Sequence, residues 1–163
     1  MYRLSHDYTG DEGLKTFLDE AAARFDETPP VAVLFHLLCD QCDGDLANRL
    51  AGIISECIPQ ALFVGGSTNG SIFDGELMSG GNVDVHVAIA CDVFEDPDAK
   101  LEVLQYRFDY ESQDETIRAL IQAVAERPWV KAVESVSTMV NVNTPELCSE
   151  ASCLPSGIAW FGG

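Results

Sequence analysis

The sequence predicts an α/β domain with a mixed sheet flanked by helices, and two patterns along the chain support this class. An apolar run, an amphipathic segment and a second short apolar run follow one another over residues 31–64. This is the pattern of a strand–helix–strand unit whose two strands are parallel. After residue 82, apolar and polar side chains alternate in two stretches, which is typical of half-buried strands that pair antiparallel.

Three segments have the apolar spacing of amphipathic helices. The first follows a polar start, has Asp11 or Thr9 as its expected cap, and ends before Pro29-Pro30. The second ends at Pro59, and the third opens on an expected capping box of Ser112 with Glu115. The apolar positions are Leu14, Phe17, Leu18, Ala21 and Phe25 in the first, Leu46, Leu50, Ile53, Ile54 and Cys57 in the second, and Ile117, Leu120, Ile121 and Val124 in the third.

The strands are expected where apolar residues run continuously or alternate. Residues 31–38 (VAVLFHLL) predict a fully buried strand, and residues 61–64 (ALFV) predict a short buried one. Residues 83–91 have period-two patterning with one strongly apolar face, and residues 104–110 alternate between apolar and polar side chains, so the two stretches are expected to pair antiparallel. Between them and the glycine-rich segment, an Asp74-Gly75 turn is expected after residues 71–73.

The C-terminal third has weaker signals. Residues 130–140 fit a helix by spacing but a strand by their β-branched content. Residues 141–157 are expected to form a loop, and residues 158–161 a last short strand. The sequence is read as one domain over residues 1–163, and because Gly162-Gly163 follows this strand directly, the domain is expected to be truncated at its C-terminal end.

Charge and composition exclude several classes of partner. The net charge is −18, which disfavours binding to nucleic acid and to anionic membrane surfaces. The sequence lacks the long apolar run of a transmembrane helix and the basic, then apolar, start of a signal peptide. These features predict a cytoplasmic protein whose six cysteines are mostly reduced thiols.

The glycine-rich segment Gly65-Gly66-Ser67-Thr68-Asn69-Gly70 is the candidate ligand-binding site. It follows the carboxyl end of an expected buried strand, which is where open α/β sheets bind ligands. Its glycines allow close backbone approach and its exposed N–H groups suit an anion. It lacks the lysine and the following helix of the nucleotide-binding loops. A tight turn between two strands is the alternative, and the residues alone leave both open.

The cysteines suggest two further kinds of chemistry. Cys39 and Cys42 form a C-x-x-C motif between an expected strand and helix, as in a thioredoxin-like thiol oxidoreductase. Asp40, Asp43 and Asp45 disfavour a thiolate there through like-charge repulsion. A zinc site would need a second pair besides the C-x-x-C pair, and the candidates are Cys148 and Cys153.

The histidines suggest structural roles. His36 lies in an apolar run and is expected to be a hydrogen-bonded core histidine, whereas His86 is placed to pair with Asp84 along one strand. No spacing marks a catalytic triad or a zinc-protease motif, so the sequence predicts no catalytic residues, no metal site and no cofactor.

The run from residue 31 to residue 70 resembles the opening of the FIST N-terminal domain. That family has a buried strand, a polar loop, a helix ending near a proline, a short strand and a G-x-[ST]-T-x-G segment, which here reads GGSTNG. The following DGELMSGGNVDVHVAIACDVFED is similar to the next strand pair of the family, and IAWFGG at the end resembles its second motif. Asn69 and Ser71 depart from residues common in related sensors.

The resemblance implies a bacterial signal transduction protein with a small-molecule sensory domain. The ligand would be a small molecule, amino acids having been proposed, and the partner would be an output signalling domain or protein. Residues 65–70 would contribute to the ligand site, with Gly162 and Gly163 approaching the same region. The expected function is a sensory input module and not an enzyme. A thiol oxidoreductase using Cys39 and Cys42, and a non-catalytic interaction domain, remain the alternatives.

Overall fold

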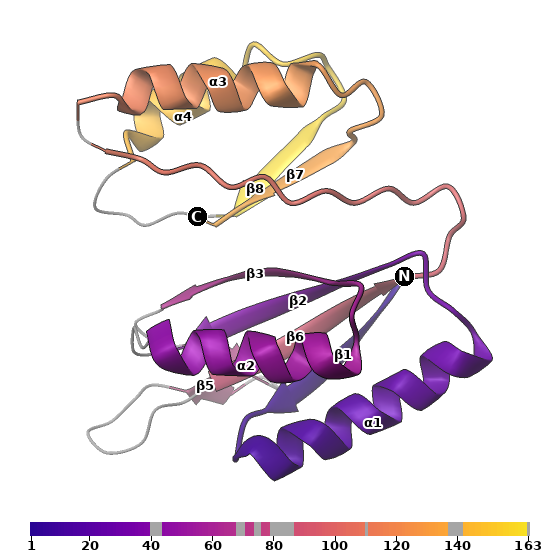
Figure 1. The fold of residues 1–163 in the computed structure, drawn as a ribbon. Helices are drawn as coiled ribbons and strands as arrows, with labels where there is room; N and C mark the ends of the chain where they lie inside the picture. Colours follow the sequence, from indigo (N-terminus) through magenta and orange to yellow (C-terminus); the bar gives the residue numbers. More distant parts are fainter. Residues whose placement is uncertain are drawn as a thin grey trace. The chain divides into compact units, whose positions relative to one another are not determined.

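The computed structural model describes residues 1–39, 44–67, 71–73, 76–78, 87–109, 111–136 and 142–162. Its internal contacts divide the chain into two compact units, Met1–Val103 and Leu104–Gly163, which are described separately (Figure 1).

The first unit contains a four-stranded mixed sheet. Its strands are β1 (Tyr2–Asp7), β2 (Ala32–Cys39), β3 (Ala61–Ser67) and β6 (Val87–Phe94), in the spatial order β1-β6-β2-β3. β2 and β3 pair in parallel, whereas β6 is antiparallel to both β1 and β2. The α/β class, the mixed sheet and the parallel strand–helix–strand unit predicted from the sequence are confirmed.

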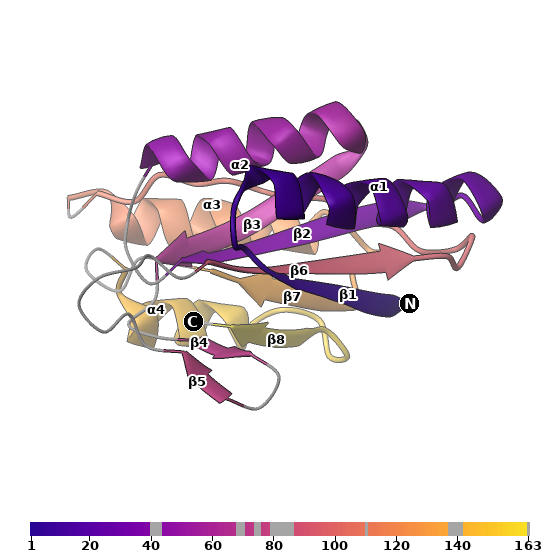
Figure 2. The ribbon, with the colours of Figure 1, turned by 90° about the horizontal axis from the view of Figure 1, so that it is seen from below.

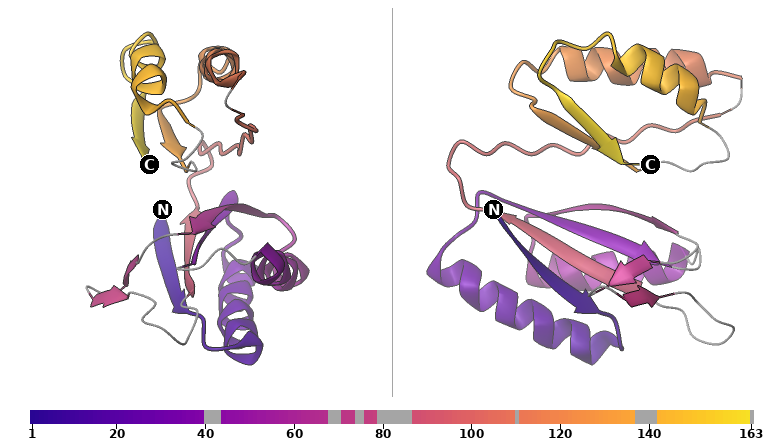
Figure 3. Two further views of the ribbon diagram at one scale, coloured as in Figure 1. Left: turned by 90° about the vertical axis from the view of Figure 1, so that its left-hand side faces the viewer. Right: turned by 180° about the vertical axis from the view of Figure 1, so that it is seen from behind.

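Two helices cover one face of this sheet. α1 (Asp11–Glu27) and α2 (Gly44–Cys57) run along the strands (Figure 2) and lie on the same side of them (Figure 3). Both helices were predicted from their apolar spacing, and the apolar positions indeed face the core. The buried residues are Leu14, Leu18, Ala21 and Phe25 in α1, and Leu50 and Ile54 in α2.

β6 is an interior strand that is buried on both faces. Val87, Ile89, Cys91 and Val93 belong to the core beneath the helices, and Ala88 and Asp92 are buried on the other face. The expectation of one apolar face was therefore incomplete, because the second face is also buried at Ala88 and at the charged Asp92. The expected start of this strand at residues 83–86 lies outside the described residues.

The expected pairing of residues 83–91 with residues 104–110 is wrong. Residues 101–109 have no regular structure, and from Leu104 onward the chain belongs to the second unit. β1, which the sequence presented only as a polar start, is the antiparallel neighbour of β6 instead. β1 is an edge strand in which Leu4 is flanked by polar residues, so it has little of the apolar signal that marks the interior strands.

The predicted helix caps are also wrong in detail. Gly10 is the N-cap of α1, with φ at 135°, and no side chain caps this helix. Asp11 is instead held by the hydroxyl of Tyr8. At the third helix, Ser112 occupies the N-cap position but its side chain makes no capping bond to the helix, and its own N–H donates to Asp109 Oδ1 at 3.1 Å.

A short antiparallel pair follows β3 along the chain. It consists of β4 (Ser71–Phe73) and β5 (Glu76–Met78). The two strands are separated by residues 74 and 75, the expected Asp74-Gly75 turn, which lie outside the described residues.

The second unit contains two helices and a two-stranded parallel sheet. α3 (Gln113–Ala125) and α4 (Thr144–Ala151) pack against each other, and β7 (Ala132–Ser135) pairs with β8 (Ala159–Gly162). The third predicted helix and the last predicted strand are confirmed, and the ambiguous segment is a strand over the four residues of β7.

The predicted loop over residues 141–157 is wrong, because it contains α4. This helix has eight residues and none of them is buried, so apolar spacing could not reveal it. Its signal is local: the side chain of Asn143 accepts a hydrogen bond from the N–H of Glu146, and Pro145 lies in the first turn.

Candidate functional site

The carboxyl ends of three strands meet at one edge of the first sheet. β1 and β2 are both antiparallel to β6, and β2 is parallel to β3, so β1, β2 and β3 run in the same direction. Cys39 ends β2 and pairs with Ser67 of β3 and with Val87 of β6. The N–H of Tyr8, just after β1, donates to the carbonyl of Val87 at 3.0 Å. Tyr8, Val87, Cys39 and Ser67 thus form one row across the sheet.

Both helices of the unit begin at this edge. α1 begins at Asp11, shortly after the end of β1, and α2 begins at Gly44, shortly after the end of β2. Helix N-termini present free N–H groups, and open α/β sheets bind ligands beyond the carboxyl ends of their strands. We therefore take this edge, called the carboxyl edge below, as the candidate site.

The predicted binding segment begins inside a strand. Gly65, Gly66 and Ser67 are the last three residues of β3 and pair with Leu37, Leu38 and Cys39 of β2. The expected strand end at Val64 was therefore three residues short. Gly65 and Gly66 are exposed at the carboxyl edge. Thr68, Asn69 and Gly70 lie outside the described residues, so their predicted role stays a prediction.

Gly65 has a structural reason to be glycine. A Cβ built at this position would overlap the backbone carbonyl oxygen of Leu37 on the neighbouring strand. By contrast, a Cβ built on Gly52 of α2 meets nothing within 4 Å. The first glycine of the segment is thus needed for the pairing of β3 with β2, independently of any contact that it makes with a ligand.

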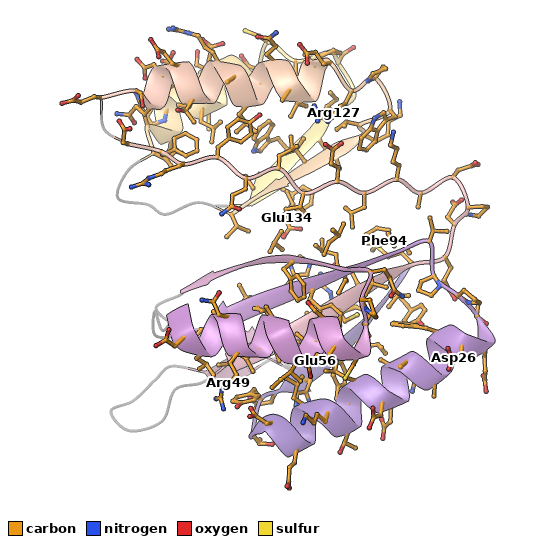
Figure 4. The ribbon with its side chains drawn as sticks, viewed as in Figure 1. Asp26, Arg49, Glu56, Phe94, Arg127 and Glu134 are labelled. Atoms are coloured by element: carbon orange, nitrogen blue, oxygen red, sulfur yellow. The ribbon has the colours of Figure 1, made fainter. Side chains whose placement is uncertain are left out.

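A polar cluster that the sequence did not reveal lies at the same edge. The Tyr8 hydroxyl donates to Asp11 Oδ1 at 2.6 Å, and Arg49 donates to Asp11 Oδ2 at 3.0 Å and to the Tyr8 oxygen at 3.1 Å. The hydrogen bond to Asp11, followed by burial, raises the pKa of Tyr8. Arg49 comes from the second turn of α2 (Figure 4), so the cluster joins β1, α1 and α2.

No spacing in the sequence marks this cluster, because its three residues come from three segments. Its electrostatics are balanced, since the Arg49 guanidinium is paired with the Asp11 carboxylate. The side chains of both residues are more than one-third exposed, so the ion pair is a modest source of stability. Its contribution to the site is to fix the start of α1 beside α2.

The redox and zinc hypotheses involve Cys39, Cys42, Cys148 and Cys153. Cys39 ends β2 and is half-buried, while Cys42 lies outside the described residues. Cys148 and Cys153 belong to the second unit. Within the described ranges, no group of three His, Cys, Asp or Glu side chains could hold a metal ion. The redox and zinc hypotheses stay predictions.

Thiol labelling of the folded protein is expected to separate the cysteines by burial. Cys91 is fully buried, and burial, followed by the field of Asp92, raises the pKa of its thiol to about 12. Because the thiolate is the reactive form, Cys91 should resist iodoacetamide while the exposed Cys148 and Cys153 react readily. Peptide mapping by mass spectrometry checks this, with urea-unfolded protein as the control in which Cys91 reacts. Equal rates for Cys91 and Cys153 in the folded protein would contradict the packing of β6.

A buried polar network lies on the face of the sheet turned away from the two helices. His36 is 7% exposed and Asp92 is 6% exposed. His36 Nε2 lies 3.1 Å from Asp92 Oδ2, which confirms the predicted hydrogen-bonded core histidine. Arg3 donates through Nε to Asp92 Oδ1 at 2.6 Å and through Nη2 to Oδ2 at 2.7 Å. The predicted pair of His86 with Asp84 lies outside the described residues.

This network holds three strands in register. Arg3 lies opposite Asp92 in the β1–β6 pair, and His36 lies on β2 two residues beyond Leu34, which is the residue opposite Asp92. The hydrogen bonds from Arg3 lower the pKa of Asp92, whereas burial works against them. Asp92 thus stays ionised inside the sheet because two partners from β1 and β2 surround its carboxylate. We infer that the role of this network is to stabilise the fold.

Comparison with protein-family models, with curated proteins and with solved structures finds no match to this chain. The resemblance to the FIST N-terminal domain therefore stays a prediction. Over the residues that the structure describes, none of the helices has both the length and the apolar character needed to cross a membrane.

Proposed function

We propose that this chain is a sensory input module that binds a small molecule at the carboxyl edge of its first sheet. The observation that carries the proposal is the meeting of three strand ends and two helix starts at that edge. Ligand sites of open α/β sheets lie at such edges. The exposed backbone of Gly65 and Gly66, with Ser67 next to them, would let a small ligand approach the main chain closely.

The proposed output is a change in the population of two arrangements of the module. A ligand that binds one arrangement more tightly shifts the equilibrium toward it, and a partner domain or protein reads the shift. The likeness of GGSTNG to the FIST motif supports an amino acid as the ligand and a cytoplasmic signalling partner. The net charge of −18 supports a partner other than nucleic acid or an anionic membrane.

A thermal-shift screen against the protein amino acids and small carboxylates such as succinate tests the proposal. A ligand present at 100 times its dissociation constant stabilises the folded state by about 2.7 kcal/mol, which raises the melting temperature by several degrees. We expect at least one compound to do so in wild type, and Ser67→Ala or Thr68→Ala to reduce the shift.

Ser55→Ala is the matched control, because Ser55 lies on the exposed surface of α2 away from the carboxyl edge. It should leave the shift unchanged. A shift that survives both Ser67→Ala and Thr68→Ala would place the ligand elsewhere. Melting temperatures that no compound raises would count against the binding function of this chain.

A further inference from the structure

His6 occupies an unusual position between β1 and α1. It lies opposite Ile89 of β6, on the helix-covered face of the sheet. Its imidazole stacks on the ring of Phe17, with ring centroids 4.9 Å apart and planes inclined by 14°. A Cβ built on Gly13, in the first turn of α1, would lie 3.9–4.0 Å from two atoms of the imidazole. The ring therefore fills the space beneath the start of α1.

One nitrogen of this ring has no hydrogen-bond partner in the described part of the chain. Nε2 of His6 is buried and has no partner among the residues that the structure describes. In the neutral imidazole the single proton can sit on Nδ1, which leaves Nε2 as a bare acceptor at small cost. The imidazolium carries a proton on both nitrogens, so protonation would place a charged N–H at a buried position for which the described residues supply no acceptor.

The surrounding charges do not compensate for this burial. Asp7, on the same strand, is the charged group whose field favours the imidazolium. α1 contributes Phe17 and Gly13 to the contact, and β6 contributes Ile89 opposite. Asp11, at the start of α1, is bonded to Tyr8 and Arg49. Burial outweighs Asp7 and lowers the pKa of His6 below its ordinary value of 6.5.

We propose that His6 is an acid-sensitive latch that releases the start of α1 from β1 when its imidazole becomes protonated. The folded state binds this proton less tightly than the unfolded chain does. The contact therefore contributes its full stability above the ordinary histidine pKa, and the contribution is lost as the pH falls through the lowered pKa of the folded state. Only the start of α1 would be released, because Phe17 and Gly13, the residues that contact His6, belong to the first turns of this helix.

Two measurements on the full chain test the latch. The imidazole of His6 is titrated by NMR in wild type, where the midpoint is expected below 6.5. Amide hydrogen exchange of Leu14, whose N–H donates to the carbonyl of Gly10 at 3.1 Å, reports the first turn of α1. Between about pH 7.5 and about pH 5 the protection of this amide, corrected for its intrinsic rate, is expected to fall.

His6→Phe keeps a ring against Phe17 but removes the titrating group, so its Leu14 amide should keep its protection over the same pH range. His6→Gln provides a second non-titrating variant should the phenylalanine not fit. Protection that falls equally in wild type and in the folding-competent variant would overturn the proposal. A His6 midpoint at or above 6.5 would overturn it as well, without recourse to any variant.

Discussion

Asp92→Asn is expected to lower the free energy of unfolding by about 2–4 kcal/mol, because the substitution removes the charged carboxylate that His36 and Arg3 contact in the buried network. Asparagine has nearly the same size, so the loss reflects charge and hydrogen bonding and not an empty space. His36, which is buried, loses its charged acceptor. The side chain of Arg3 is 57% exposed and recovers hydration, which keeps the expected loss near the lower part of the range for buried pairs.

Urea unfolding at neutral pH measures this loss. Asp19→Asn makes the same chemical change on the exposed face of α1 and is expected to alter stability by less than about 0.5 kcal/mol. The lowered pKa of Asp92 adds a pH signature. Its ionised form stabilises the fold above the ordinary aspartate pKa, and this contribution disappears as the pH falls through the lowered value. The wild type should therefore lose more stability in acid than Asp92→Asn does. A variant as stable as wild type at neutral pH would contradict the network.

Gly65→Ala is expected to lower the free energy of unfolding by about 3 kcal/mol, at the upper end of the usual cost of overpacking. The new methyl group would overlap the carbonyl oxygen of Leu37. That oxygen belongs to the backbone of β2, which is held between β3 and β6, so it cannot move aside as the end of a side chain could. The clash must open the β2–β3 pair at the carboxyl edge.

Gly52→Ala is the matched control for this substitution. Gly52 lies in α2 with open space around it, and replacing glycine by alanine within a helix stabilises by about 0.5–1 kcal/mol. Opposite signs for the two variants in urea unfolding are the expected result. A Gly65→Ala protein as stable as wild type would show that β3 does not approach β2 as closely as described. Because Gly65 shapes the sheet, Ser67 and Thr68 are better probes of binding.

The sequence predicted those elements whose pattern of buried apolar residues can be seen in the element itself. α1 and α2 present buried leucines at helical spacing, as Leu14 and Leu18 show in α1. β2 reads as a continuous apolar run because its interior is buried on both faces, as Leu34 and Phe35 illustrate. In these elements the local sequence pattern agrees with the tertiary environment, so the sequence alone is enough to predict them.

The parts that the sequence missed depend on distant partners or on local bonds. β1 is defined by pairing with β6, more than eighty positions later in the chain, and its residues alone look like a polar start. Residues 104–109 alternate like a strand, yet they form none. α4 has no buried face and is marked by the bond between Asn143 and Glu146 and by Pro145 in its first turn.

The candidate site likewise has parts that could be predicted from the sequence and parts that could not. The strand that ends in Gly65, Gly66 and Ser67 could be located from its apolar run, although the sequence placed its end at Val64. The hydrogen bond of His36 could be expected from an imidazole in an apolar run, but its partner Asp92 could not, because the two are 56 positions apart in sequence. The cluster of Tyr8, Asp11 and Arg49 exists only once β1, α1 and α2 are assembled.

Mapping a ligand onto the backbone amides by NMR would test the central proposal most directly. A compound identified by thermal shift would be titrated into the isotope-labelled protein. Binding at the carboxyl edge predicts the largest shifts at Tyr8, Cys39, Ser67 and Val87, and small ones at the opposite edge, at Ala32, Ala61 and Phe94. Shifts concentrated at the opposite edge or in the second unit would contradict the proposed site.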